Sequence, residues 1–345
     1  MIFSILFMII AFIAGIIFDC FNKGKKLKVR NILQQITIIY LLFKIGFFGG
    51  SELINQEWQT VLIQGIVAII ASSLWTFLVL ILLKRWSSFE PITQISIATH
   101  FGSVSVGTFI AGIAFLEAMK ININPSAVIW LSIMEFPAII IGMWLLGVRA
   151  NTLLSIIKEK LVLAVLPISI VLGILFGSSM PSNIKSVLFG YLFTPILLYF
   201  LFEMGCKASE SLWNLKKDIG SVFFVGIAVP ILGGVTGSSV GYLMGYSTSG
   251  MFIMAILMAS ASYVLAPLCM YEVLKSIYKP KLKIAKQVVA TSMALSVGVT
   301  LPFNILIGFE LYYIIIKALQ ALPFLYLFGL GLPLALGILS MVRWK

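Results

Sequence analysis

Apolar runs long enough to cross a lipid bilayer follow one another along the whole chain. A transmembrane helix needs about 20 predominantly apolar residues, and eleven such stretches alternate with short polar segments. They cover residues 2–19, 32–50, 59–83, 93–119, 126–148, 161–178, 187–206, 219–246, 251–274, 287–309 and 320–342. The pattern predicts an all-α polytopic membrane protein.

Two of these spans carry small and polar residues at the depth of the hydrocarbon. Residues 99–108 read THFGSVSVGT, and residues 259–267 read ASASYVLAP. In hydrocarbon, backbone N–H and C=O groups must be hydrogen-bonded within the protein, so a non-helical segment survives there only where it lines a buried cavity. We therefore expect two broken transmembrane helices, with Pro267 in the first turn of the second helix where it resumes.

The two broken spans are followed by the same residues at the same spacing. Glu117, Lys120 and Pro125 recur 155 residues later as Glu272, Lys275 and Pro280. This indicates a duplication, with spans one to five in residues 1–150, spans six to ten in residues 151–317, and an additional C-terminal span in residues 318–345. Because five is an odd number, the second unit would cross the membrane in the opposite direction. An inverted repeat with two broken helices is typical of secondary transporters.

Composition argues against a soluble protein. Of the 345 residues, 61% are hydrophobic and 10% are charged, and the mean hydropathy is +1.11, far from the values of soluble domains. The net charge of +12 would suit nucleic-acid binding, but the basic residues form short clusters between apolar runs, so we expect no nucleic-acid partner. The sequence has no zinc motif, nucleophile motif or paired catalytic carboxylates, so we expect neither an enzyme nor a bound cofactor.

The two breaks supply candidate binding groups. A half-helix that begins at mid-depth points unpaired N–H groups and the positive end of its dipole toward the bilayer centre, and such ends attract small anions. The alternative is that the small residues only allow close helix packing. The substrate-binding residues expected from the breaks are Ser103, Ser105, Gly107, Thr108, Ser260, Ser262 and Tyr263.

Several ionisable residues lie inside predicted spans, where an uncompensated charge is costly, and four of them are candidates for a specific role. Glu135 is the candidate ion-coupling residue, as a cation ligand or a proton carrier, although it could instead pair with a neighbouring helix. Lys44 and Glu203 occupy corresponding positions of the two repeats, so we expect an ion pair between them, or side chains that reach toward the membrane surface. His100 is either a proton shuttle or a structural hydrogen-bonding residue.

Three stretches resemble the sodium-dependent bicarbonate transporter family known from cyanobacteria. They are residues 41–50 (LLFKIGFFGG), the segment from Gly102 to Pro137, and the Ser-x-Ser segment from Ser260 to Pro267. The resemblance covers spans one to ten in order. It implies a five-plus-five inverted repeat, a core domain with crossed broken helices that moves against a scaffold, and sodium-driven uptake of a small anion across the plasma membrane, the inner membrane of a bacterium. Tyr263 stands where the family pattern has an acid.

The leading hypothesis is a secondary active transporter for a small anion, with Na⁺-coupled bicarbonate uptake as its activity. Another small carboxylate with different cation coupling is the alternative within this class. A channel, and a membrane sensor or assembly subunit that does not transport, are the hypotheses from other classes. The expected partners are a small anion and the lipid bilayer, and a homo-oligomer is compatible with the sequence.

The positive charges predict the orientation in the membrane. If Met1 lies outside, alternation of the spans places 20 of the 24 Lys and Arg residues in the cytoplasm, as the positive-inside rule requires. Reporter fusions should therefore place Met1 outside and Lys345 inside. Reporters that place both ends on the same side would show that the eleventh stretch does not cross the membrane.

Overall fold

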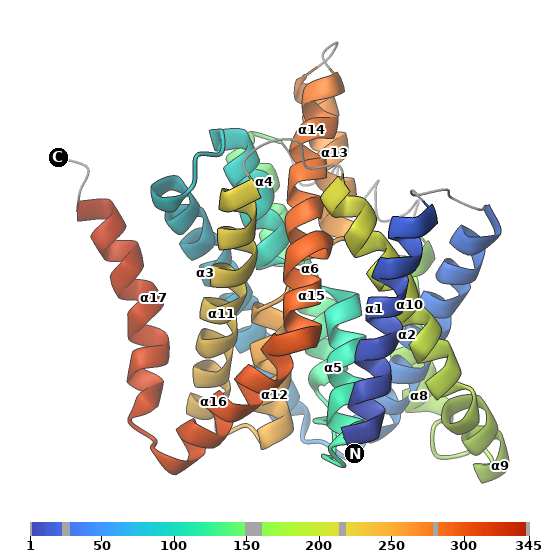
Figure 1. Ribbon diagram of the computed structural model, residues 1–345. Coiled ribbons are helices and arrows are strands. Elements are labelled where there is room, and N and C mark those ends of the chain that lie inside the picture. The colour runs from blue at the N-terminus through green and yellow to red at the C-terminus, as the bar shows by residue number, and fades with distance from the viewer. Residues whose placement is uncertain (1, 23–27, 149–160, 214–218, 279–281, 343–345) are drawn as a thin grey trace.

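The computed structural model in Figure 1 describes residues 2–22, 28–148, 161–213, 219–278 and 282–342. The chain is 85% helical, and the described residues contain no strand. Among them, seven helices are long and apolar enough to cross a membrane, and three shorter apolar helices accompany them. The prediction of an all-α membrane protein is confirmed.

The helices follow the predicted spans closely. In chain order they are α1 (Ile2–Asn22), α2 (Lys28–Leu53), α3 (Trp58–Trp86), α4 (Pro91–Gly102), α5 (Val106–Ala118), α6 (Ala127–Leu145), α8 (Leu161–Phe176), α9 (Ser182–Lys185), η1 (Ser186–Tyr191), α10 (Phe193–Trp213), α11 (Ile219–Leu243), α12 (Thr248–Met258), α13 (Leu265–Ile277), α14 (Leu282–Met293), η2 (Ala294–Thr300), α15 (Leu301–Phe303), η3 (Asn304–Gly308), α16 (Phe309–Ala321) and α17 (Leu325–Val342). Two predicted spans are each divided into two helices, α4 with α5 and α12 with α13, at the positions expected for the breaks.

The tenth predicted span is longer than expected. Its end at residue 309 is wrong, because α14 to α16 form one helical run that continues to Ala321. Glu310 does not stop this run, since the residues after it are again mainly apolar and the first proline comes at Pro323. Two π-helical stretches, η2 and η3, flank Pro302, which cannot donate a backbone hydrogen bond. The division expected at residue 317 falls inside α16, and the repeat boundaries stay a prediction.

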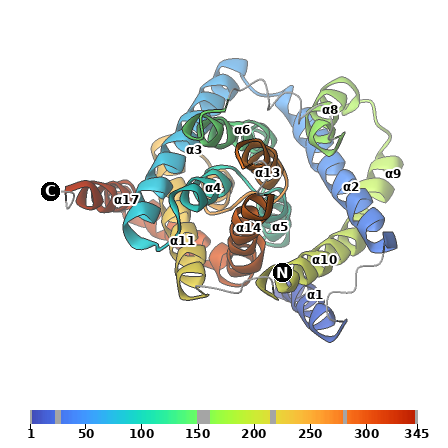
Figure 2. The same cartoon turned by 90° about the horizontal axis from the view of Figure 1, so that it is seen from above.

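The helices form two groups, seen from above in Figure 2. In one group, here called the scaffold, α1 packs on α10 and α2 packs on α8. In the other, here called the core, α3 and α6 pack on α4, and α11 and α16 pack on α12. The scaffold and the core also contact each other, mainly where α10 of the scaffold packs on η2 of the core. The C-terminal helix α17 packs on α11 and α3 at the edge of the core.

Large apolar side chains cover much of the outer surface. Leu74 is 64% exposed, Phe224 53% and Phe328 68%, and they belong to different helices. Apolar surface of this extent is unfavourable in water but suits lipid. The structure contains no membrane, and Met1 and Lys345 lie outside the described residues, so the orientation stays a prediction.

The scaffold depends on close backbone contact between α1 and α10. A Cβ atom on Gly15 of α1 would overlap the carbonyl oxygen of Phe202, and one on Gly205 of α10 would overlap the carbonyl oxygen of Phe12. Small residues at such positions let transmembrane helices approach until their backbones touch. The contact is therefore made by backbone atoms, which cannot shift as a flexible side chain can.

We predict opposite effects of Gly→Ala substitution at two helical positions. Gly205→Ala should destabilise the protein by about 1–3 kcal/mol because the new methyl group forces α1 and α10 apart. Gly220→Ala, at a site with no atom within 4 Å of the added Cβ, should be neutral or stabilising by up to about 1 kcal/mol because alanine favours helix. Thermal unfolding of both purified variants in one detergent measures the difference. Equal melting temperatures would contradict this account of the interface.

Candidate functional site

The two breaks lie against each other in the centre of the core. Residues 103–105 separate α4 from α5, and residues 259–264 separate α12 from α13. The backbone N–H of Ser105 donates to Ser260 Oγ at 2.9 Å, and the backbone N–H of Ser262 donates to the carbonyl oxygen of His100 at 2.7 Å. The half-helices pack crosswise, α5 with α12 and α4 with α13. Each break therefore supplies partners for the other.

Serine hydroxyls complete the hydrogen bonding of both breaks. Ser105 Oγ accepts from the N–H of Thr108 at 3.1 Å and caps α5, and Ser262 Oγ accepts from the N–H of Ala266 at 3.3 Å. Ser260 Oγ also donates to the carbonyl oxygen of Leu257. Ser103 Oγ donates to the carbonyl oxygen of Glu135 at 3.0 Å. All four serines thus have hydrogen-bond partners within the protein.

A second layer of polar contacts fixes the start of the longer break. Asn304 Nδ2 donates to the carbonyl oxygen of Ala259 at 2.9 Å. Tyr312 Oη lies 2.9 Å from Asn304 Oδ1 and 3.1 Å from the carbonyl oxygen of Pro230. These contacts join the break to α11 and to the long helical run from α14 to α16.

A cavity of about 440 Å³ lies beside the breaks, between core and scaffold. Two of the predicted site residues, Glu135 and Tyr263, line it. The other six do not reach the cavity wall and lie behind it: Ser103, Ser105, Gly107, Thr108, Ser260 and Ser262. The first residues of the two resumed helices, Val106 of α5 and Leu265 of α13, form part of the wall, so both positive helix ends meet the cavity.

Two residues that line this cavity each carry a buried polar atom with no hydrogen-bond partner among the residues that the structure describes. The two atoms are Glu135 Oε1 and Gln34 Nε2. Two more such atoms, His100 Nε2 and Thr108 Oγ1, lie at the first break. A buried polar atom without a partner is costly, so these atoms are candidates for contact with a bound ion or water. The sequence prediction missed Gln34, although two adjacent glutamines inside an apolar span were a usable signal.

Tyr263 connects the cavity to the scaffold. Its hydroxyl donates to Met204 Sδ of α10 at 3.3 Å, and a Cβ added to Gly107 would overlap the phenolic oxygen. The amine of Lys207 lies 5.8 Å from the centre of the Tyr263 ring and also lines the cavity. The cavity therefore combines an acid, an amine, amides and a phenol.

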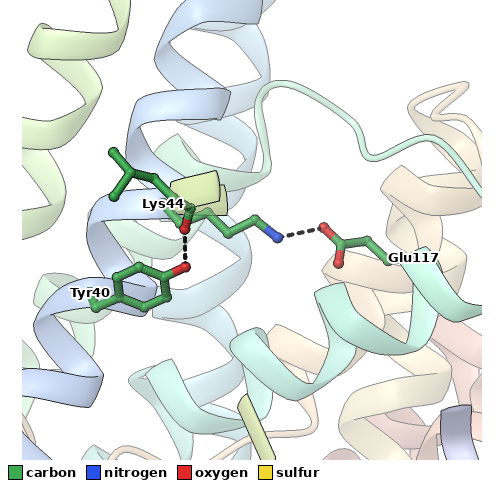
Figure 3. Close-up of polar contacts among 4 residues, drawn as sticks. Tyr40, Lys44 and Glu117 are labelled. Carbon is green, nitrogen blue, oxygen red and sulfur yellow. Dashed lines mark hydrogen bonds and ion pairs between the residues drawn. The ribbon is translucent and has the colours of Figure 1, made fainter. Parts of the chain in front are cut away.

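Lys44 makes its ion pair with Glu117 rather than with Glu203, the partner expected from the sequence. Lys44 Nζ lies 3.2 Å from Glu117 Oε1, as Figure 3 shows. One turn earlier on α2, the hydroxyl of Tyr40 donates to the carbonyl oxygen of Leu188. Lys44 and Glu203 are both buried within the protein, 8% and 2% exposed. The physical reason for the difference is that Lys44 and Glu117 line one cavity, to which Glu203 does not contribute.

The described residues contain no group of three or more His, Cys, Asp or Glu that could hold a metal ion. The cavity beside the breaks has one carboxylate, Glu135. A monovalent cation bound there would have to take its other oxygen ligands from carbonyls, amides or hydroxyls.

We predict that the breaks depend on Ser260 for stability. Ser260→Ala removes the acceptor of the buried Ser105 N–H, which should cost about 1–3 kcal/mol. Ser73→Ala is the matched control, because Ser73 Oγ bonds only to Ile69 of its own helix and its loss should change little. Thermal unfolding of both variants in the same detergent is the measurement. A Ser260→Ala protein as stable as Ser73→Ala would contradict the role given to Ser260.

Comparison with known proteins agrees with this architecture. No individually curated protein matches the chain. A comparison with protein families matches residues 7–317, which include both breaks and the cavity between core and scaffold, to the Na⁺-dependent bicarbonate transporter superfamily. The resemblance found in the sequence is confirmed, and the chain belongs to the Na⁺-dependent bicarbonate transporter superfamily, a family of multi-pass membrane transporters.

Proposed function

We propose that the protein takes up bicarbonate together with Na⁺ through the cavity beside the two breaks. The observation that carries this proposal is that two residues lining that cavity carry unpartnered buried polar atoms, Glu135 Oε1 and Gln34 Nε2. One is an acceptor suited to a cation, and the other is a donor suited to an anion. Glu135 and Gln34 line the same cavity as Val106 and Leu265, the first residues of the two resumed helices.

The cavity can compensate the charge of a small anion. The positive ends of α5 and α13 meet its wall at Val106 and Leu265. The Gln34 amide can donate to a carboxylate oxygen, and the Lys207 amine adds positive charge to the wall. Bicarbonate also carries one O–H group, for which the amide oxygens of Gln34 and Gln35 are acceptors.

An inverted repeat of the two proposed units would allow the core to move against the scaffold. Ser105 and Ser260 occupy equivalent positions of the two proposed units, residues 1–150 and 151–317, and they bond directly. The packing of α1 on α10 has its counterpart in the packing of α8 on α2, and that of α3 on α4 in that of α11 on α12. Two units of opposite orientation can give two conformations that open to opposite sides of the membrane.

The coupled cation depends on the carboxylates of the cavity. Tyr263 stands where the family pattern has an acid, and Glu135 is the one carboxylate among the described residues that line the cavity. A single carboxylate can hold Na⁺ or carry a proton. Transport of another small carboxylate with proton coupling is therefore the second candidate.

Uptake of labelled bicarbonate into proteoliposomes tests the proposal. A Na⁺ gradient should drive uptake by the wild-type protein, and Glu135→Gln should reduce Na⁺-driven uptake about tenfold or more, because a contact to a charged ligand contributes about 1.5–3 kcal/mol. Glu310→Gln is the control, because Glu310 is an exposed carboxylate on α16, outside the cavity. It should transport like the wild type.

Three other results would count against the proposal. Uptake driven by a pH gradient but not by Na⁺ would favour proton coupling. Uptake of a short carboxylate in preference to bicarbonate would assign a different substrate. Absence of any gradient-driven uptake by folded protein would favour a membrane sensor or assembly subunit.

A further inference from the structure

A second cavity lies between scaffold and core, separate from the first. Its volume is about 720 Å³, and no residue lines both cavities. Along α2, residues 34–42 contribute to the first cavity and residues 44–52 to the second. The two cavities therefore follow each other along the scaffold–core interface, with the Lys44–Glu117 ion pair in the second.

Lys44 is held between the two groups of helices. Its amine lies 3.2 Å from the Glu117 carboxylate of the core and 3.0 Å from the ring centre of Phe193, which belongs to α10 of the scaffold. The side chain of Lys44 is 10% exposed and that of Glu117 is 37% exposed. Figure 3 shows the amine reaching from α2 across to the carboxylate on α5.

Opening the interface at this end must separate the two charges. A buried amine that loses its counter-ion is strongly unfavourable, and the Phe193 ring compensates only part of its charge. The partly exposed Glu117 carboxylate loses less interaction free energy when the pair separates, because solvent screens its charge. The ion pair therefore resists movement of the core away from the scaffold on the side of the second cavity.

The corresponding positions of the second proposed unit carry different charges. In the proposed repeat, Glu203 corresponds to Lys44 and Glu272 corresponds to Glu117, so two acids replace an acid and an amine. Glu272 instead pairs with Lys275 of its own helix, at 3.2 Å. An ion pair that joins core and scaffold can thus form between these four positions only at the Lys44 end.

We infer that the Lys44–Glu117 ion pair is a latch that resists separation of core and scaffold at the second cavity. The inference rests on the proposed function, because a latch of this kind matters for a protein that exposes its two cavities in turn. It assigns Lys44 and Glu117 a role in conformational gating, with no contact to the substrate in the first cavity. Its consequence is that opening the interface at the second cavity requires the loss of this ion pair.

Two neighbouring positions on α6 can report on the two cavities. Val128 lines the second cavity and packs against Gly49 of α2, and Ser132, one turn later, lines the first. Val128→Cys and Ser132→Cys would be made separately in a background with Cys20, Cys206 and Cys269 replaced by alanine. The labelling rate with a charged thiol reagent is measured in nanodiscs, where the reagent reaches both faces.

Loss of the latch should change the two rates in opposite directions. Glu117→Gln should raise the labelling rate at the Val128→Cys position about three- to tenfold, a moderate effect because Glu117 is partly exposed, and should lower it at the Ser132→Cys position. The exchange of charges in Lys44→Glu with Glu117→Lys should return both rates toward those of the parent. Glu272→Gln, which removes the matched ion pair within α13, should leave both rates unchanged.

The inference is overturned if Glu117→Gln changes neither rate, raises both together, or acts no differently from Glu272→Gln. Hydrogen exchange in protein with its native cysteines gives the second measurement, for use if the cysteine-free background does not fold. There, Glu117→Gln should accelerate exchange in residues 113–128, and Glu272→Gln should not. Neither readout involves transport, so failure of bicarbonate uptake would remove the proposed function while these results decide the latch.

Discussion

Every backbone N–H and C=O at the depth of the hydrocarbon needs a partner inside the protein, and the two breaks satisfy this requirement largely through each other. The N–H of Ser105 reaches the hydroxyl of Ser260, and the N–H of Ser262 reaches the carbonyl of His100. Neither break could exist at this position alone, because its freed backbone groups would face lipid or apolar side chains. The crossing of the half-helices, and the cavity against it, follow from this mutual dependence.

The same requirement explains why most of the predicted site lies behind the cavity wall. A serine hydroxyl is well suited to hydrogen-bond the backbone groups that a helix break leaves unpaired, because it is small and can both donate and accept. Ser103, Ser105, Ser260 and Ser262 all do this. The groups that face the cavity come instead from Glu135, Tyr263, Gln34 and Lys207, on helices that are not themselves broken or at the rim of a break. Structural and ligand-facing roles are thus divided between two layers of residues.

The sequence allowed the spans and both breaks to be predicted, because a glycine or serine among long apolar side chains has a clear physical meaning in a bilayer. The partner of Lys44 could not be found in this way. In the proposed repeat, Ser105 and Ser260 are equivalent positions, and they bond directly. Lys44 and Glu203 are also equivalent positions in that proposal, but Lys44 pairs with Glu117. Equivalence along the chain does not by itself bring two side chains together.

The hydrophobic pattern also could not predict where the tenth helix ends. A lone Glu310 interrupts the apolar run, but a single glutamate does not break a helix. Gln34 was missed for the opposite reason. Its span is apolar enough to be recognised in spite of two glutamines. A prediction based on the mean hydropathy of a span does not single out the individual polar residues within it. Which of its faces meets protein depends on tertiary packing that the sequence does not encode locally.

The contacts of Asn304 and Tyr312 have a consequence for how such a protein can evolve. They fasten the second break to α11 and to the long helical run, so the polar centre is one unit with the helices that surround it. In the proposed transport cycle this unit moves as a rigid body, so its internal hydrogen bonds are not broken and formed again at every turnover. Selectivity then resides in the few side chains facing the cavity, which core and scaffold both contribute. Substitutions there can change what is bound while the hydrogen bonds that hold the breaks stay as they are, which gives natural selection one set of residues for binding and another for the architecture of the centre.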